Sequence, residues 1–127
     1  MVGTTRTVLV VDDDASVRKA LRPLLRSAGY AVEVFASAAD FLAHPVPPGT
    51  GCLALDIRMP GISGLDLQQQ LATTQPDLPI VVITGHGDAE LRQRALAGGA
   101  VAVLYKPFED EVLLEAVARA IGGGGPA

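Results

Sequence analysis

Short apolar runs alternate along the chain with longer segments whose apolar residues recur every three or four positions. The short runs are rich in Val, Ile, Leu and Ala, and they predict strands that are buried on both faces. They cover residues 7–11, 31–35, 52–55, 79–83 and 101–105. The longer segments predict amphipathic helices, because apolar residues at this spacing form one stripe along a helix. These helices are expected over residues 14–28, 37–43, 64–74, 88–97 and 109–121.

The same spacing predicts which helical side chains face the core. In the helix over 64–74, three leucines are expected to point inward and the three glutamines at positions 68 to 70 outward. The first helix is expected to bury Val17, Ala20, Leu21, Leu24, Leu25 and Ala28, and to expose Arg18, Lys19, Arg22 and Arg26. The last helix is expected to bury Val112, Leu113, Ala116, Val117, Ala120 and Ile121. Pro23 interrupts the first helix, where a proline removes one hydrogen bond and costs roughly 3 kcal/mol or a kink.

Strands that alternate with helices predict an α/β fold, with a parallel sheet and helices on both of its faces. Right-handed crossovers and short connections favour a doubly wound arrangement. The functional site of such a fold lies beyond the carboxyl ends of the strands, where the strand order reverses. Glu33 indicates that the second strand lies at an edge of the sheet, away from that point.

Length and composition favour one globular domain. The chain has 127 residues, of which 49% are hydrophobic, and this is enough to close a single core. We predict a domain over residues 1–121 and a flexible Gly-rich tail, or the start of a linker, over residues 122–127. Cys52 is the only cysteine and is expected to be a buried thiol. His44 lies alone in the Pro-rich loop over 44–51, and we interpret it as solvated.

Charge and hydropathy exclude two classes of partner. The net charge of −4 argues against nonspecific DNA binding, which needs a surplus of Lys and Arg. No apolar run approaches the ~18 residues of a membrane span, and residues 1–7 lack the apolar core of a signal peptide. The chain is therefore expected to be a soluble intracellular domain.

Polar residues follow four of the five predicted strands, at the point where each strand ends. Asp12 and Asp13 follow the first strand, and Asp56 follows the third. Thr84 and Lys106 follow the fourth and the fifth. Each has an ordinary structural interpretation, because Asp often caps a helix, Thr often lies in a turn and a lone Lys is usually solvated. Their occurrence together at one edge of the sheet favours a functional site.

These residue types are suited to binding a metal ion and a phosphoryl group. Three carboxylates in a partly dry crevice repel one another strongly. A hard divalent cation removes that conflict, and carboxylate and carbonyl oxygens suit Mg²⁺. Lys106 adds a positive charge and Thr84 a hydroxyl donor, which can hold a phosphoryl group during its transfer. Asp56 is best placed to accept that group by covalent carboxylate catalysis.

At these positions the chain resembles response-regulator receiver domains of two-component signalling. The resemblance covers about residues 7–121 and rests on Val10-Val11-Asp12-Asp13-Asp14, Leu55-Asp56-Ile57-Arg58-Met59-Pro60 with Gly64, Ile83-Thr84-Gly85 and Lys106-Pro107-Phe108. Residues 85–88 and 106–110 are most similar to receivers of the nitrogen-fixation regulator type, which usually precede a helix-turn-helix DNA-binding domain. The resemblance implies a flavodoxin-like (βα)5 fold, with a doubly wound, parallel, five-stranded sheet of strand order 2-1-3-4-5.

The resemblance also implies roles for individual residues. Asp56 would take a phosphoryl group from the phosphohistidine of a sensor histidine kinase. The ligands implied for Mg²⁺, or for Mn²⁺ as a substitute, are Asp13, Asp56, the backbone carbonyl of Arg58 and, through water, Asp12. Lys106 would pair with Asp56 and later with the phosphoryl oxygens, toward which Thr84 would move. The Lys106–Pro107 bond would be cis, which is cheap only before proline.

A receiver of this kind is a cytoplasmic phospho-acceptor that promotes its own phosphotransfer and dephosphorylation, not an enzyme that turns over a substrate. The resemblance implies a switch in conformation and partner binding, and homodimerisation on phosphorylation follows by analogy. This domain is expected to bind neither nucleic acid nor membrane directly. A C-terminal DNA-binding output domain would lie outside this chain.

One position departs from the family pattern. Receivers usually carry an aromatic residue three positions before the motif lysine, where this chain has Val103, and the nearest aromatic is Tyr105. An aromatic rotation at that position is therefore not available. We predict instead that signalling runs through Thr84 and through the loop and helix over residues 86–97.

Three further residues keep two interpretations each. Arg58 either shields the acyl phosphate from water or is an exposed loop cation. His86 either orients water or is solvated. Pro23 either alters partner choice through the first helix or is accommodated by a local bend.

Three other functions use similar residues or a similar fold. A haloacid-dehalogenase-type phosphatase also combines Asp, Mg²⁺, Thr and Lys, but its nucleophile follows the first strand, with a second Asp two residues later. A flavin carrier of the flavodoxin type needs a hydroxyl- and Gly-rich phosphate loop where this chain has Asp12, Asp13 and Asp14. A receiver that binds proteins without phosphorylation would not need the complete set of Asp, Thr and Lys, although Val103 is compatible with it.

Overall fold

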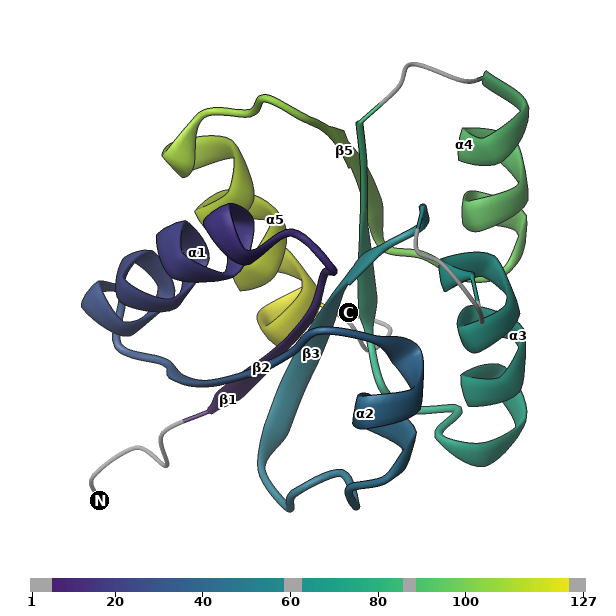
Figure 1. Ribbon diagram of the computed structural model, residues 1–127, viewed down its shortest axis with the longest axis horizontal. Coiled ribbons are helices and arrows are strands. Elements are labelled where there is room, and N and C mark those ends of the chain that lie inside the picture. The colour runs from purple at the N-terminus through teal and green to yellow at the C-terminus, as the bar shows by residue number, and fades with distance from the viewer. Residues whose placement is uncertain (1–5, 59–62, 86–88, 124–127) are drawn as a thin grey trace.

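Five parallel strands form one sheet in the order β2-β1-β3-β4-β5 in the computed structural model, which describes residues 6–58, 63–85 and 89–123 (Figure 1). The strands are β1 (Thr7–Val11), β2 (Ala31–Phe35), β3 (Thr50–Asp56), β4 (Ile80–Thr84) and β5 (Ala102–Tyr105). Each neighbouring pair is parallel. The predicted doubly wound α/β fold, its strand order and the edge position of β2 are confirmed.

Helices cover both faces of this sheet (Figure 1). One face carries α1 (Ala15–Ser27) and α5 (Asp110–Gly123), and the other carries α2 (Ala38–Leu42), α3 (Gly64–Thr74) and α4 (Ala89–Ala97). Successive strand residues point to opposite faces, so β1 serves two cores. Val8 and Val10 pack with α1 and α5, whereas Leu9 and Val11 pack with α2, α3 and α4. This double burial explains the continuous apolar run of β1, Val8 to Val11.

The helices begin at side-chain caps. The carboxylate of Asp14, where the first helix was expected to begin, accepts a hydrogen bond from the Ser16 backbone N–H at 2.8 Å. Ser37, the first residue of the helix expected over 37–43, caps α2 by accepting from the Asp40 N–H at 3.0 Å. Asp88, the first residue of the helix expected over 88–97, lies outside the described residues. α1 continues across Pro23 to Ser27, so this proline is accommodated within the helix.

Some element boundaries differ from those predicted by one or two residues. β4 begins at Ile80 and not at Pro79, which has no N–H to donate to a neighbouring strand. α5 runs on to Gly123, two residues into the predicted tail. The last turns of α5 pack closely against the start of β3. The side chain of Ile121 lies so near Gly51 that a Cβ at position 51 would come within 2.7 Å of it. Among the described residues, no helix is both long enough and apolar enough to cross a membrane.

Several side chains differ in burial from the sequence prediction. Ala20 and Ala28 of the α1 segment are exposed, and so is Val112 of α5, at 46%. Ala20 and Val112 lie beside the apolar stripe of their helix rather than at its centre, and Ala28 is the C-cap that follows α1. Gln68 was predicted to be exposed but is buried, with 3% of its surface accessible. Cys52 is buried, as predicted, and burial raises the pKa of its thiol to about 12.

Gln68 is buried because α4 packs against α3 at this point. Its Nε2 donates to the backbone carbonyl of Ala95 at 2.8 Å, which satisfies the side-chain amide inside the core. The amide also lies against Gly98, where a Cβ would come within 3.0 Å of it. Helical periodicity identifies the flank of an apolar stripe, but only the position of α4 decides that this flank is covered.

Truncating Gln68 is expected to destabilise the fold. Gln68→Ala removes a buried hydrogen bond and leaves a gap between α3 and α4, so the free energy of unfolding should fall by about 1–3 kcal/mol. The matched control Gln69→Ala changes an exposed neighbour on the same helix and should stay within about 0.5 kcal/mol of the wild type. Urea unfolding followed by circular dichroism measures both. Equal stability of the two variants would contradict a structural role for Gln68.

The polar residue His44 is exposed, in agreement with the prediction that it is solvated. Its Nδ1 lies 2.8 Å from the backbone carbonyl oxygen of Asp40, one turn back along the chain. Its ring also lies beside Phe35, with 5.6 Å between ring centroids. These contacts hold the imidazole at the end of α2, beside the last residue of the edge strand β2.

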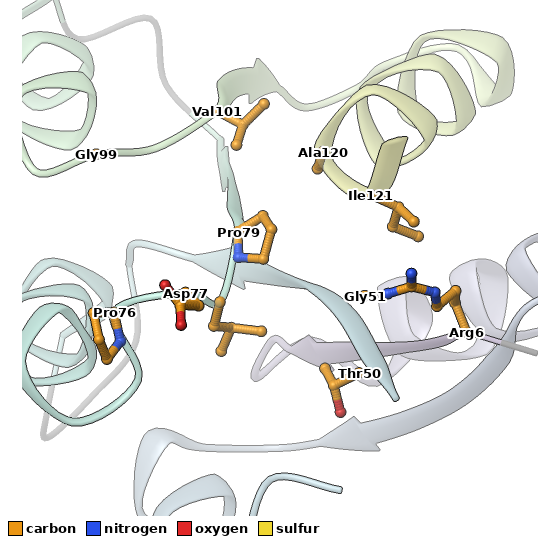
Figure 2. Close-up of a pocket in the computed structure, with 11 residues that line it drawn as sticks. Arg6, Thr50, Gly51, Pro76, Asp77, Pro79, Gly99, Val101, Ala120 and Ile121 are labelled. Atoms are coloured by element: carbon orange, nitrogen blue, oxygen red, sulfur yellow. The ribbon is translucent and has the colours of Figure 1, made fainter. Parts of the chain in front are cut away.

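The amino ends of β3 and β4 border an open pocket of about 410 Å³ (Figure 2). Its charged lining residues are Arg6 and Asp77, and Pro79, Val101 and Ile121 supply apolar surface. This pocket lies at the opposite edge of the sheet from the ends of β1, β3, β4 and β5 that carry the predicted site. Its lining brings together no cluster of carboxylates.

Candidate functional site

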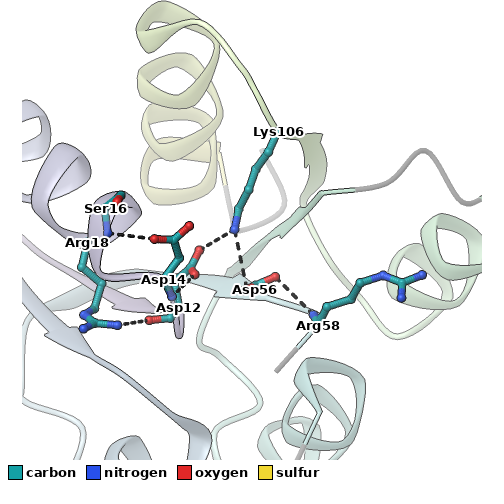
Figure 3. A network of polar contacts seen from close by, with 7 residues as sticks. All are labelled: Asp12, Asp14, Ser16, Arg18, Asp56, Arg58 and Lys106. Atoms are coloured by element: carbon teal, nitrogen blue, oxygen red, sulfur yellow. Dashed lines mark hydrogen bonds and ion pairs between the residues drawn. The ribbon is translucent and has the colours of Figure 1, made fainter. Parts of the chain in front are cut away.

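The carboxyl ends of four strands bring the predicted polar residues to one edge of the sheet, where Figure 3 shows Asp12, Asp56 and Lys106. Asp12 follows β1, Asp56 ends β3, Thr84 ends β4 and Lys106 follows β5. Parallel neighbouring strands end at the same edge, so residues far apart in sequence meet there. Asp12 and Asp56 are only 1% and 3% exposed, and Thr84 is fully buried. Buried carboxylates next to one another are costly unless something compensates their charge.

Three carboxylates form an acidic cluster at this edge. One oxygen from each of Asp12, Asp13 and Asp56 lies within 4.8 Å of the others. Asp13 is exposed and forms the solvent side of the cluster, whereas the other two lie beneath it. Oxygen donors at this spacing fit a hard divalent cation. The grouping of these three residues, predicted from strand ends alone, is confirmed.

Lys106 compensates part of this negative charge. Its Nζ lies 2.9 Å from Oδ2 of Asp12 and 3.6 Å from Oδ2 of Asp56 (Figure 3). The shorter contact has ion-pair distance, but Oδ2 of Asp12 has no hydrogen-bond partner of good geometry among the described residues. One ammonium therefore serves two buried carboxylates, and the cluster keeps a net negative charge. This is the environment that a bound cation would stabilise.

Backbone groups hold the two buried carboxylates in place. Oδ1 of Asp12 accepts from the Asp14 N–H at 2.9 Å, and Oδ1 of Asp56 accepts from the Arg58 N–H at 3.2 Å. The Lys106 N–H donates to the Thr84 carbonyl at 2.8 Å, which ties the start of the β5–α5 connection to β4. The Lys106–Pro107 peptide bond is cis, as the resemblance implied.

The surroundings at this edge raise the pKa of an acidic side chain, Asp56, and of a basic one, Lys106. The pKa of Asp56 is raised from 3.8 to about 6: burial is the largest cause and the nearby charge of Asp12 adds to it, while Lys106 and the Arg58 N–H offset part of the rise. Burial by itself lowers the pKa of Lys106, but its contacts with Asp12 and Asp56 outweigh this and leave the pKa raised. Lys106 is therefore a permanent cation at neutral pH.

The raised pKa of Asp56 predicts a pH-dependent cost in the metal-free protein. The folded state binds the proton more tightly than the unfolded state, so ionised Asp56 destabilises the fold. The cost is absent below pH 3.8, grows up to about pH 6 and is complete above it. At 1.36 kcal/mol per pKa unit, the upper limit of this cost in the free energy of unfolding is about 3 kcal/mol. Screening by water lowers the cost, so the expected range is roughly 1–3 kcal/mol.

Asp56→Asn removes this cost. Without metal, the variant is expected to unfold with a higher free energy than the wild type at pH 8, by roughly 1–3 kcal/mol, and with the same free energy near pH 4. Urea unfolding at a series of pH values, with a chelator present, measures the difference. A difference that does not change with pH would contradict the assignment of the buried charge to Asp56.

The remaining predicted residues lie at the margin of the cluster. Arg58 is exposed, and its backbone N–H donates to Asp56. Val103 is partly buried and packs against the core that includes α3 and α4. Tyr105 stands opposite Thr84 in the β4–β5 register. His86 lies outside the described residues.

Sequence reasoning missed the role of two residues near the cluster. Arg18 was assigned to the solvent face of α1 but is half-buried, and its Nη1 donates to the Asp12 carbonyl at 2.7 Å (Figure 3). Gly64 leaves room for the end of β3, because a Cβ there would lie 2.6 Å from Cα of Ile57. A signal for Arg18 was its place in the first turn of the helix that follows the acidic loop. No periodicity could show the close approach at Gly64.

The sequence of residues 8–118 matches the family described as response regulator receiver domain. The chain belongs to this family. It is a receiver domain of two-component signal transduction, a phospho-acceptor rather than an enzyme with a substrate that it turns over. Asp12, Asp13 and Asp56 form its acidic phosphorylation pocket. Membership decides against the phosphatase and flavin-carrier alternatives.

Individual relatives support the predicted subtype. The chain is 50% identical to Nodulation protein W of Bradyrhizobium diazoefficiens over 118 residues, which is 93% of this chain and 52% of that protein. It is 44% identical to the transcriptional regulatory protein FixJ of Rhizobium meliloti, over 92% of this chain and 57% of that protein. A crystal structure of FixJ-N has a TM-score of 0.85 and 41% identity, over 94% of this chain and 96% of that one. The predicted similarity to nitrogen-fixation regulators is confirmed, and the chain spans about half the length of these two curated relatives.

Proposed function

We propose that Asp56 accepts a phosphoryl group from the phosphohistidine of a sensor histidine kinase, with Mg²⁺ bound at the acidic cluster. The observation that carries this proposal is the cluster itself: among the described residues, the ammonium of Lys106 pairs with the two buried carboxylates, Asp12 and Asp56, and the exposed carboxylate of Asp13 adds a third negative charge beside them. Such a site is short of positive charge until a cation binds. The phosphohistidine donor is made from ATP, so we place this function in the cytoplasm.

Asp56 is the carboxylate best suited to be the acceptor. Both oxygens of Asp12 are engaged, one by the Asp14 N–H and the other by Lys106 at 2.9 Å. Asp56 has a looser contact with Lys106, at 3.6 Å, and its backbone is fixed at the end of the central strand β3. An oxygen of Asp56 would form a bond to phosphorus while the phosphorus–nitrogen bond to the kinase imidazole breaks and its electron pair stays on that nitrogen.

The residues present fit a magnesium ion. Asp13, Asp56 and the backbone carbonyl of Arg58 would hold it directly, and Asp12 would act through water, with Mn²⁺ as a substitute. When bound, the ion offsets negative charge on the phosphoryl oxygens as the group transfers. Lys106 would shift from its carboxylate partners toward those oxygens, and the hydroxyl of Thr84 would donate to them. Arg58 is exposed beside the acceptor, a position from which it could exclude water.

Signalling would start at Thr84 and not at an aromatic residue of β5. Val103 occupies the aromatic position and packs in the core on the α3–α4 side, so it has no large ring to rotate. We propose that Thr84 moves toward the phosphoryl group and that residues 86–97 follow it. The altered surface would then change binding to a partner, either a second copy of this chain or a C-terminal DNA-binding output domain such as those of regulators of this type.

Acetyl phosphate tests the proposed function on the wild-type chain. Incubation with acetyl phosphate and Mg²⁺ should add one phosphoryl group per chain, read by intact mass, and an excess of chelator should prevent it. Borohydride reduces an acyl phosphate on Asp to homoserine, and peptide mapping should place this residue at position 56. No added group, or a group at another residue, would overturn the proposal and favour a receiver that binds partners without phosphorylation.

A further inference from the structure

Arg18 holds the peptide that joins two members of the acidic cluster. Its guanidinium reaches from the first turn of α1 back to the loop that follows β1, where Nη1 donates to the Asp12 carbonyl at 2.7 Å (Figure 3). Arg18 is half-buried, whereas Lys19 and Arg22 on the same helix are exposed. The bond is short and involves a charged donor, which places it among the stronger hydrogen bonds.

The three carboxylates of the cluster are restrained to different degrees. Asp12 is held by the Asp14 N–H and by Lys106, and Asp56 is held by the Arg58 N–H and by Lys106. The carboxylate of Asp13 makes no hydrogen bond or ion pair within the part of the chain that the structure describes, and it is exposed. Its position therefore depends on its backbone.

Arg18 acts on that backbone. The peptide unit between Asp12 and Asp13 is planar, so a bond to its carbonyl oxygen also fixes the direction in which Cα of Asp13 leaves it. We propose that Arg18 is a positioning residue of the metal site, which keeps the Asp13 carboxylate within reach of an ion held by Asp12 and Asp56. The inference rests on the proposed function, because that function supplies the ion.

Charge and geometry predict opposite effects of removing Arg18. A guanidinium near three carboxylates repels an incoming cation, so loss of its charge alone would tighten Mg²⁺ binding. Loss of the hydrogen bond would let the Asp12–Asp13 peptide rotate, and the Asp13 carboxylate would have to be reoriented each time an ion binds. Removing a group that orients a metal ligand typically weakens metal binding by about 10- to 100-fold. A rise in the Kd for Mg²⁺ on loss of Arg18 would therefore indicate a positioning role, and a fall in the Kd would indicate an effect of its charge alone.

Magnesium titration of the unphosphorylated chain tests the inference without any transfer reaction. Amide NMR spectra of the ¹⁵N-labelled protein would be followed through a MgCl₂ series for the wild type, Arg18→Met, Arg18→Gln, Arg22→Met and Asp13→Asn. Arg22→Met is the matched control, because it removes the same charge and leaves the same side chain one turn further along the exposed face of α1. The dispersion of each spectrum shows whether the variant is folded. Two different substitutions of Arg18 are compared, so that the result does not depend on the side chain that replaces the arginine.

We expect the Kd for Mg²⁺ to rise about tenfold or more in both Arg18 variants and to stay unchanged or fall slightly in Arg22→Met. Unchanged or tighter binding in the Arg18 variants, with saturable binding in the wild type, would overturn the positioning role and leave the proposed function standing. Asp13→Asn lacks a proposed ligand of the ion and is the reference for weakened binding. If the wild type shows no saturable shifts either, the result would overturn the metal site and the inference together.

Discussion

Asp56→Asn is expected to abolish phosphoryl uptake from acetyl phosphate in the presence of Mg²⁺. An amide oxygen is a poor nucleophile, and the variant also removes one of the negative charges that bind the cation. The substitution keeps the size of the side chain, and the metal-free protein should be at least as stable as the wild type near neutral pH because a buried charge is lost. A loss of labelling therefore cannot be attributed to unfolding. Intact mass should show no added phosphoryl group under conditions that label the wild type fully.

Asp77→Asn is the matched control for this experiment. Asp77 is an exposed carboxylate at the opposite edge of the sheet (Figure 2), and its loss changes the net charge by the same amount. This variant should be labelled as fast as the wild type. Labelling of Asp56→Asn at the wild-type rate would show that the acceptor is another residue, and Asp13 would be the first to examine because it shares the acidic cluster.

Gly64→Ala is expected to lower both the stability of the fold and the rate of phosphoryl uptake. A Cβ at this position would lie 2.6 Å from Cα of Ile57 and closer still to the carbonyl oxygen of Asp56. These are backbone atoms that no change of rotamer can move. The start of α3 must therefore separate from the end of β3, and the hydrogen bond from the Gly64 N–H to the Ile57 carbonyl, at 2.9 Å, is strained or lost.

The expected loss in the free energy of unfolding is about 1–3 kcal/mol, as for other overpacked positions. A shift of about 1 Å in the position of Asp56 can slow a reaction by about a hundredfold.

Gly122→Ala is the control, because a Cβ there meets no atom within 4 Å and an alanine favours helix by roughly 0.5–1 kcal/mol. Urea unfolding and the time course of labelling measure both effects. Gly64→Ala with wild-type stability and rate would show that α3 and β3 can separate without consequence.

The candidate site was predictable because its residues stand at the ends of unmistakable strands. Four apolar runs end in Asp, Thr or Lys, and parallel strands end at one edge, so the grouping follows from topology without any distance. This topology groups Asp12, Asp13 and Asp56, whose oxygens lie within 4.8 Å of one another in the structure. The motifs around Asp56 and Lys106 then identified the family, which the similarity over residues 8–118 confirms.

The errors lie where two elements meet on the flank of a helix. Gln68 and Arg18 were both assigned to solvent because each stands beside an apolar stripe. One is covered by α4, and the other reaches back to the Asp12 carbonyl. Val112 shows the opposite error, since an apolar residue beside the stripe of α5 stays exposed. Periodicity locates the centre of a buried face but not its width.

The sequence by itself determined the order of strands and helices, the edge of the sheet that carries the chemistry and the residues that stand there. These depend on local pattern and on the handedness of crossovers, which are properties of the chain. Only the tertiary structure decided how the acidic cluster is supported: Lys106 shared between Asp12 and Asp56, Arg18 on the Asp12 carbonyl, and Gly64 against the end of β3. Such contacts join residues from separate elements, and their geometry follows from how closely those elements pack, which no single segment encodes.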